Sequence, residues 1–63
     1  MFKNLDAEQA RFGKTDQNMA DMLEISRVSY VNKKKSGKFN VNEAQRMCAF
    51  FGCSFEYLFA TAS

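Results

Sequence analysis

The sequence predicts an all-α domain of five short helices, and three observations lead to that prediction. Gly13, Gly37 and Gly52 each follow a stretch that reads as helix, and glycine is favoured just past a helix C-terminus. Residues preferred at helix N-caps precede these stretches. Apolar residues recur at intervals of three and four, and no stretch alternates convincingly at a period of two.

The first two predicted helices lie on either side of Gly13. The first follows Asn4, whose side-chain oxygen can accept a hydrogen bond from an otherwise unpaired N–H of the first turn. The second runs from about Thr15 to Leu23, with Thr15 as its cap. Met19 and Met22 share one face of it.

Three more helices are predicted in the second half of the chain. Ser26 caps the third, which ends before Gly37. Asn40 begins the fourth, and Glu43 three residues later resembles the partner residue of a capping box. The apolar stripe of this helix consists of Val41, Ala44, Met47, Cys48 and Phe51. Ser54 caps a short fifth helix, whose apolar face consists of Phe55, Leu58 and Phe59.

The composition is that of one small folded domain spanning residues 1–63. Hydrophobic residues make up 46% of the chain, with seven Phe and no Pro, which suits a compact core and argues against disorder. No apolar run approaches the roughly 18 residues that a membrane helix needs. The N-terminus has no apolar stretch typical of a signal peptide, so we expect a cytoplasmic protein with no membrane partner.

Residues that could support catalysis or metal binding are scarce. The chain has no His, and a zinc site needs about four ligands. Cys48 and Cys53 are therefore expected to be two small buried thiols. With no general base and no Gly-rich phosphate loop, we expect neither an enzyme nor a cofactor.

Positive charge is concentrated in one segment. Residues 27–38 hold five cations and no acid, whereas the rest of the chain holds four cations and seven acids. Such a basic stretch is the usual footprint of a nucleic-acid surface. The alternative is a solvated helix end, because cations suit the C-terminus of a helix and short charge runs are usually just solvated.

The centre of the chain has the pattern of two helices joined by a tight turn at Glu24-Ile25, over about residues 15–36. Ala20 is small where the two helices must cross closely, and Ile25 and Tyr30 can face the core. The side chains left to project outward are Arg27, Val28, Ser29, Asn32 and Lys33. Donors mixed with a methyl-bearing residue suit a major groove.

On these residues the chain resembles the phage repressor and Cro (XRE-type) family of helix-turn-helix domains. Leu5 and Gly13 match the first helix of the family and its exit, and M-C-A-F-F-G-C-S-F-E-Y-L-F, residues 47–59, matches its closing segment. The resemblance implies a lambda-repressor-like fold. It also implies a phage-derived or mobile-element transcriptional regulator, such as a repressor, that binds double-stranded operator DNA as a homodimer.

Carried over by position, the resemblance also implies which residues touch DNA. The base-reading candidates of the third helix are Arg27, Val28, Ser29, Asn32 and Lys33. Arginine can fork to guanine, asparagine can pair with adenine, and valine can pack on a thymine methyl. The phosphate-binding candidates are Lys14, Thr15, Gln17, Lys34, Lys35, Lys38 and Asn40.

Several positions depart from the family pattern. Asp16 stands where members commonly carry a Gln that touches DNA, and a carboxylate there would repel phosphate. Gln9 and Lys34 occupy positions where the family often pairs an Arg with a Glu, which makes Lys34 a spare cation. Gly37 comes one residue late, so the third helix is expected to be lengthened or re-angled. Lys14 occupies an often apolar position, where Phe12 is expected to supply the packing.

The aromatic residues near the C-terminus are expected mostly in the core. Phe50 and Tyr57 are the exceptions, because they fall where the family pattern is generally polar. They are candidates for an exposed patch that binds a second copy or another protein. With Asp16 and the modest net charge of +2, this patch motivates an alternative function. In it the chain is a helix-turn-helix-shaped antirepressor or modulator that binds another regulator protein.

Overall fold

The structure, a computed structural model of the chain, describes residues 1–61. Within them the polypeptide forms helices and no strand, so the predicted all-α class with five short helices is confirmed. The helices are α1 (Lys3–Arg11), α2 (Asp16–Leu23), α3 (Arg27–Ser36), α4 (Val41–Phe51) and α5 (Phe55–Leu58). None of the helices in this part of the chain is long and apolar enough to span a membrane.

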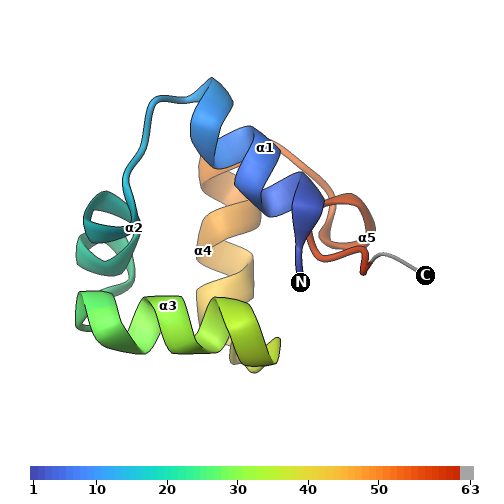
Figure 1. Cartoon of the computed structure of the whole chain (residues 1–63). Coiled ribbons are helices and arrows are strands. Elements are labelled where there is room, and N and C mark those ends of the chain that lie inside the picture. Colours follow the sequence, from blue (N-terminus) through green and yellow to red (C-terminus); the bar gives the residue numbers. More distant parts are fainter. Residues whose placement is uncertain (62–63) are drawn as a thin grey trace.

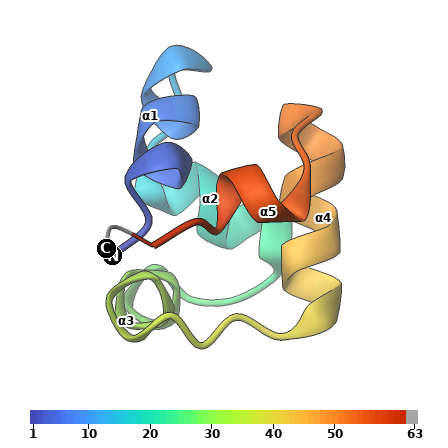
Figure 2. The same cartoon turned by 90° about the vertical axis from the view of Figure 1, so that its right-hand side faces the viewer.

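The helices pack into a body of 28 × 22 × 20 Å, with α3 at one edge. Figure 1 shows α3 along the lower edge and α1 along the upper edge, with α2 and α4 between them. Figure 2 shows α3 end-on, and in neither view does another helix lie below it. α2 packs chiefly on α3, whereas the short α5 packs on α1 and α4. One face of α3 is therefore left uncovered by the rest of the fold.

Side-chain caps fix the starts of four helices, as predicted. Thr15, Ser26, Asn40 and Ser54 each accept a hydrogen bond from the backbone N–H three residues later. At Asn40 the pattern is a reciprocal capping box with Glu43. Each such cap typically stabilises a helix by about 1 kcal/mol. These local hydrogen bonds explain why the sequence pattern located four of the five starts.

The predicted cap at Asn4 is wrong. α1 begins two residues earlier than predicted, at Lys3, and its N-cap position is Phe2, which makes no side-chain capping bond. Phe2 is buried, so tertiary packing rather than capping sets where this helix begins. The Asn4 amide instead donates a 2.8 Å hydrogen bond to the Tyr57 carbonyl and ties α1 to α5.

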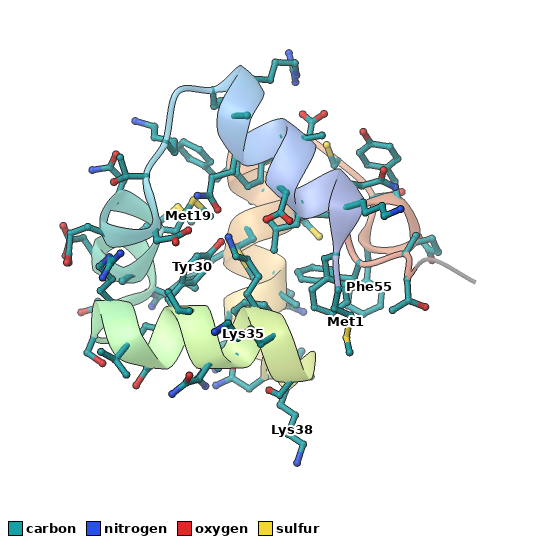
Figure 3. All side chains as sticks on the ribbon, in the orientation of Figure 1. Met1, Met19, Tyr30, Lys35, Lys38 and Phe55 are labelled. Atoms are coloured by element: carbon teal, nitrogen blue, oxygen red, sulfur yellow. The ribbon has the colours of Figure 1, made fainter. Side chains whose placement is uncertain are left out.

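The core lies where the five helices meet. Met19, Ala20 and Tyr30 are fully buried, which confirms the predicted inward direction of Tyr30, and Figure 3 shows the Met19 and Tyr30 side chains directed between the helices. Burying a large apolar side chain contributes about 1.5–3 kcal/mol. The other large side chains with essentially no exposure are Leu5, Met47 and Leu58.

Several apolar residues lie where the helical pattern did not place them. Val41 and Phe55 are 71% and 59% exposed, although both were expected on buried stripes. Each is the first residue of its helix, where the chain is still at the surface. Of the closing aromatic residues expected in the core, Phe51 is buried and Phe59 packs against the core, so Phe55 alone departs from the expectation.

Phe2, near the start of the chain, is buried in the core, where its ring contacts two other aromatic rings. The Phe2 ring lies 5.3 Å from the Phe59 ring and 6.2 Å from the Phe39 ring. Neither Phe2 nor Phe39 belongs to a predicted stripe. Cys48 and Cys53 are half-buried free thiols, less enclosed than expected.

The turn between α2 and α3 contains an unfavourable backbone conformation. Glu24 has φ 59° and ψ 40°, and it is the only non-glycine residue with positive φ within residues 1–61. Its N–H donates to the Asp21 carbonyl and the Ile25 N–H donates to the Ala20 carbonyl. Arg46 of α4 bonds the Glu24 carboxylate at 3.0 Å. A non-glycine residue in this region costs roughly 1–2 kcal/mol.

Replacing Glu24 with Gly is expected to stabilise the protein by about 0.5–1 kcal/mol. Glycine relieves the backbone penalty, part of which is offset by the greater entropy of glycine in the unfolded chain. The substitution also removes the ion pair with Arg46, but this pair is exposed and contributes little to stability. Urea unfolding followed by circular dichroism measures the change, and Glu24→Ala serves as the control that loses the ion pair but keeps the strain. Equal stability of the two variants would contradict this account.

Candidate nucleic-acid interface

α3 presents one side to the core and the opposite side to solvent. Tyr30 is fully buried, and at about 100° per residue the helix turns Val28, Asn32 and Lys35 to the far side. These three residues are exposed. Arg27, the first residue of α3, is also exposed, although the same geometry places it about 60° around the helix from Tyr30. We call Arg27, Val28, Asn32 and Lys35 the outer face of α3. Three of the five predicted base-reading residues lie on it.

Ser29 lies beside the outer face rather than on it. Its backbone N–H donates to the Ser26 hydroxyl, which in turn donates to the Ser29 hydroxyl at 3.0 Å. The side chain is half-buried and belongs to the helix cap. Ser29 therefore stabilises the start of α3, and its hydroxyl is already engaged.

Lys33 does not project outward as expected. Its Nζ lies 3.0 Å from Oε1 of Glu43, which is buried in the first turn of α4. Helical geometry explains the difference, because Lys33 and Lys34 fall on either side of the buried Tyr30. The charge of Lys33 is therefore compensated within the fold.

Lys34 is likewise not the spare cation that was expected. Its Nζ lies 3.1 Å from an Asp6 oxygen and 3.0 Å from an Asp16 oxygen, and its side chain is only 18% exposed. Burial opposes the charge of Lys34, but the hydrogen bonds to Asp16 and Asp6 raise its pKa overall. For Lys34 to bind phosphate as predicted, both carboxylates would have to be displaced.

A hydrogen-bond network extends from this lysine across three helices. The Tyr30 hydroxyl donates to Gln9 Oε1 at 2.7 Å, and Gln9 Nε2 donates to Asp16 Oδ1 at 2.9 Å. The same Asp16 oxygen accepts the bond from Lys34. Hydrogen bonds from Gln9 and then Lys34 lower the pKa of Asp16. Asp16 therefore holds α3 through Lys34. Because the lysine compensates its negative charge, much of the expected repulsion of phosphate is removed.

The side chains of Thr15 and Asn40 are occupied by the fold. Each caps its own helix by accepting from the third backbone N–H of the following turn. Gln17 is exposed, but its amide donates to the Asp21 carboxylate at 2.8 Å. Of these three phosphate candidates, only Gln17 has a side chain that could turn to DNA at small cost.

The free cations of the predicted phosphate set lie in two places. Lys35 and Lys38 are exposed near the end of α3 and form no ion pair within residues 1–61, and Figure 3 shows Lys38 directed away from the molecule. Lys14 lies in the connection between α1 and α2, at the far end of α2 from the turn (Figure 1). Its Nζ is 5.6 Å from the centre of the Phe50 ring. The structure therefore places Lys35 on the outer face and Lys38 just past the end of the same helix, whereas Lys14 lies elsewhere.

The two predicted patch residues have different surroundings. Phe50 is 39% exposed and its ring contacts Phe12 and Phe51 at 5.5 and 5.0 Å. Tyr57 is 43% exposed and its hydroxyl donates to the Glu8 carboxylate at 3.2 Å. Phe12 also packs 5.1 Å from Phe51, as expected for the residue that supplies this packing. Phe50 therefore packs in an aromatic group with Phe12 and Phe51, whereas Tyr57 is held by Glu8.

Two acidic residues important to this surface were missed in the sequence. Asp6 and Glu43 decide which lysines of the basic segment are free, because they pair with Lys34 and Lys33. Both acids are distant in the chain from their lysines, so no local pattern links them. The only available signal was that Gln9 and Lys34 both depart from the family pattern.

Comparison of the chain with protein-family models, with curated proteins and with solved structures found no match. Within residues 1–61, no three His, Cys, Asp or Glu side chains cluster as a metal site would require.

Replacing Lys34 with Met is expected to destabilise the fold by about 1–2 kcal/mol, because Asp6 and Asp16 lose their shared cation. Lys35→Met removes the same charge from the exposed outer face and should change stability by less than about 0.5 kcal/mol. Urea unfolding of both variants measures the difference. Equal effects of the two substitutions would show that Lys34 has no anchoring role.

The same network predicts an acid-dependent loss of stability. The pKa of Asp16 is lowered by folding from its ordinary value of 3.8. Its contribution is therefore complete above that value and is lost as the pH falls through the lower folded-state pKa. Unfolding free energies between about pH 6 and pH 2.5 should fall less steeply for Asp16→Asn than for the unmodified chain. Identical slopes would contradict the prediction.

Proposed function

We propose that this chain is a helix-turn-helix DNA-binding protein that reads duplex DNA with α3 in the major groove. The observation that carries the proposal is the outer face of α3. It is exposed and uncovered by other helices, while Tyr30 holds the opposite side of the same helix in the core. A helix presented in this way by a preceding helix and a tight turn has the geometry of a recognition helix.

The outer face offers three complementary kinds of base contact. The Arg27 guanidinium can bind both acceptors of a guanine, and the Asn32 amide can pair with an adenine edge. Val28, which is 66% exposed, can pack on a thymine methyl. Each good bidentate pair is worth about 1–3 kcal/mol of discrimination between bases.

The charges support a modest electrostatic contribution to binding. Arg27, Lys35 and Lys38 form no ion pair within residues 1–61, whereas Lys33 and Lys34 are paired with acids. With Arg27 assigned to a base, Lys35 and Lys38 leave about two phosphate-neutralising cations per chain, which correspond to a salt slope of roughly −2 in log K against log[salt]. Binding by one chain is then weak, which favours a homodimer on two half-sites.

The resemblance to the phage repressor and Cro family extends the proposal. It assigns the chain a lambda-repressor-like helix-turn-helix fold and a role as a phage-derived or mobile-element transcriptional regulator of operator DNA in the cytoplasm. The buried Ala20 and Tyr30 and the tight turn at Glu24 support this assignment.

A second candidate function is a modulator that binds another regulator protein instead of DNA. The pairing of Lys33 and Lys34 with acids favours it, because it reduces the positive charge available to phosphate. In that case duplex DNA should show no salt-dependent binding, and the chain should co-purify with a regulator encoded beside it.

DNA binding is tested with duplexes selected from a random pool at low salt. Asn32→Ala should weaken binding to the selected sequence by about 5–150-fold, while binding to unrelated duplexes stays the same. Lys35→Gln should weaken binding to all sequences and reduce the salt slope by about 1. Fluorescence anisotropy over a range of salt concentrations measures both effects.

The matched control is Lys3→Gln, which removes an exposed cation of α1 outside the outer face. It should leave the salt slope unchanged if α3 makes the contacts. If the unmodified chain shows no salt-dependent binding to any duplex at low ionic strength, the proposed function is refuted.

A further inference from the structure

An open hollow lies on the side of the molecule formed by α2 and α4. It has a volume of about 270 Å³ and is lined by Lys14, Asn18, Met19, Asp21, Met22 and Phe50. No residue of α3 lines it. The hollow is thus separate from the outer face, and a partner could occupy it without covering α3.

The floor of the hollow is apolar and adaptable. Met19 is buried beneath it, Met22 is half-buried, and the Phe50 ring stands at its edge, supported by Phe12. Methionine side chains adjust readily to an inserted group. A cavity of about 150 Å³ already holds a benzene ring, so this hollow has room for one aromatic side chain.

The rim carries one charge of each sign. Lys14 and Asp21 both line the hollow and are both exposed. Neither forms an ion pair within residues 1–61. The Asp21 carboxylate accepts a hydrogen bond from Gln17, and the Lys14 ammonium lies over the Phe50 ring. Both charges are therefore available to a partner at the edges of the apolar floor.

We propose that the occupant of this hollow is a second copy of the same chain, related by a two-fold axis. In a two-fold interface the same patch meets itself and each contact occurs twice, so pairing Lys14 of one copy with Asp21 of the other compensates both rim charges. The Phe50 rings then enter the facing hollows. A uniformly acidic or basic partner would leave one rim charge unpaired, whereas the chain itself presents both charges beside an aromatic ring.

This interface does not depend on the proposed DNA binding. It buries residues of the α1–α2 connection, α2 and α4, and it leaves the outer face of α3 free. A contact built on two Phe50 rings and two rim ion pairs belongs to the small, weak class of interfaces. The dimer is therefore expected to dissociate on dilution.

The test is sedimentation equilibrium without DNA, at concentrations up to about 1 mM. Lys14→Asp or Asp21→Lys alone places like charges face to face twice, and each should raise the dimer dissociation constant about tenfold. The double variant exchanges the two charges and should restore the dissociation constant to within about twofold of the original. Circular dichroism checks that all variants remain folded.

A pair of aromatic substitutions provides a second, independent measurement. Phe50→Ser should weaken the dimer about tenfold, because a central aromatic anchor is lost from both copies. Phe55→Ser is the matched control, since Phe55 is more exposed but lies on α5, outside the hollow. A chain that stays monomeric throughout, or a dimer unaffected by Lys14→Asp and Phe50→Ser, would overturn the proposal.

Discussion

The placement of α3 depends on the buried hydroxyl of Tyr30. A phenol with no exposure to solvent needs a hydrogen-bond partner, and Gln9 of α1 supplies the acceptor at 2.7 Å. The Gln9 amide then needs an acceptor, which is Asp16 of α2, and the Asp16 charge needs a cation, which is Lys34 of α3. Each requirement creates the next, so three helices are joined by one connected set of polar groups. In a partly buried setting such a network is worth more than its separate contacts.

Ion pairs within the fold also decide how the basic segment is used. The segment from residue 27 to residue 38 is strongly basic in sequence, but Lys33 and Lys34 turn toward acids of α4, α1 and α2. The charge left for a partner belongs to Arg27, Lys35 and Lys38. The solvated-end and DNA-surface interpretations of the lysine run are therefore both incomplete, because part of the run holds the fold together.

Within residues 1–61, the two surfaces proposed to bind partners differ in chemistry. The outer face of α3 is polar and cationic, which suits the edges of bases and the phosphates around them. The hollow beside Phe50 is apolar with one charge of each sign, which suits a protein surface. Because the two are made of different helices, the proposed DNA binding and the proposed self-association can be tested and refuted separately.

The sequence by itself determined the features that depend on neighbouring residues. The all-α class, four helix starts, the tight turn and the inward direction of Tyr30 follow from capping and periodicity, which act within one or two turns. Tertiary structure alone decided the partner of Lys34, the exposure of Val41 and Phe55, and the burial of Phe2. These depend on contacts between residues far apart in the chain, and a local pattern cannot tell which helices will meet. The free charge of α3, and with it the candidate site, was therefore settled only when the helices packed.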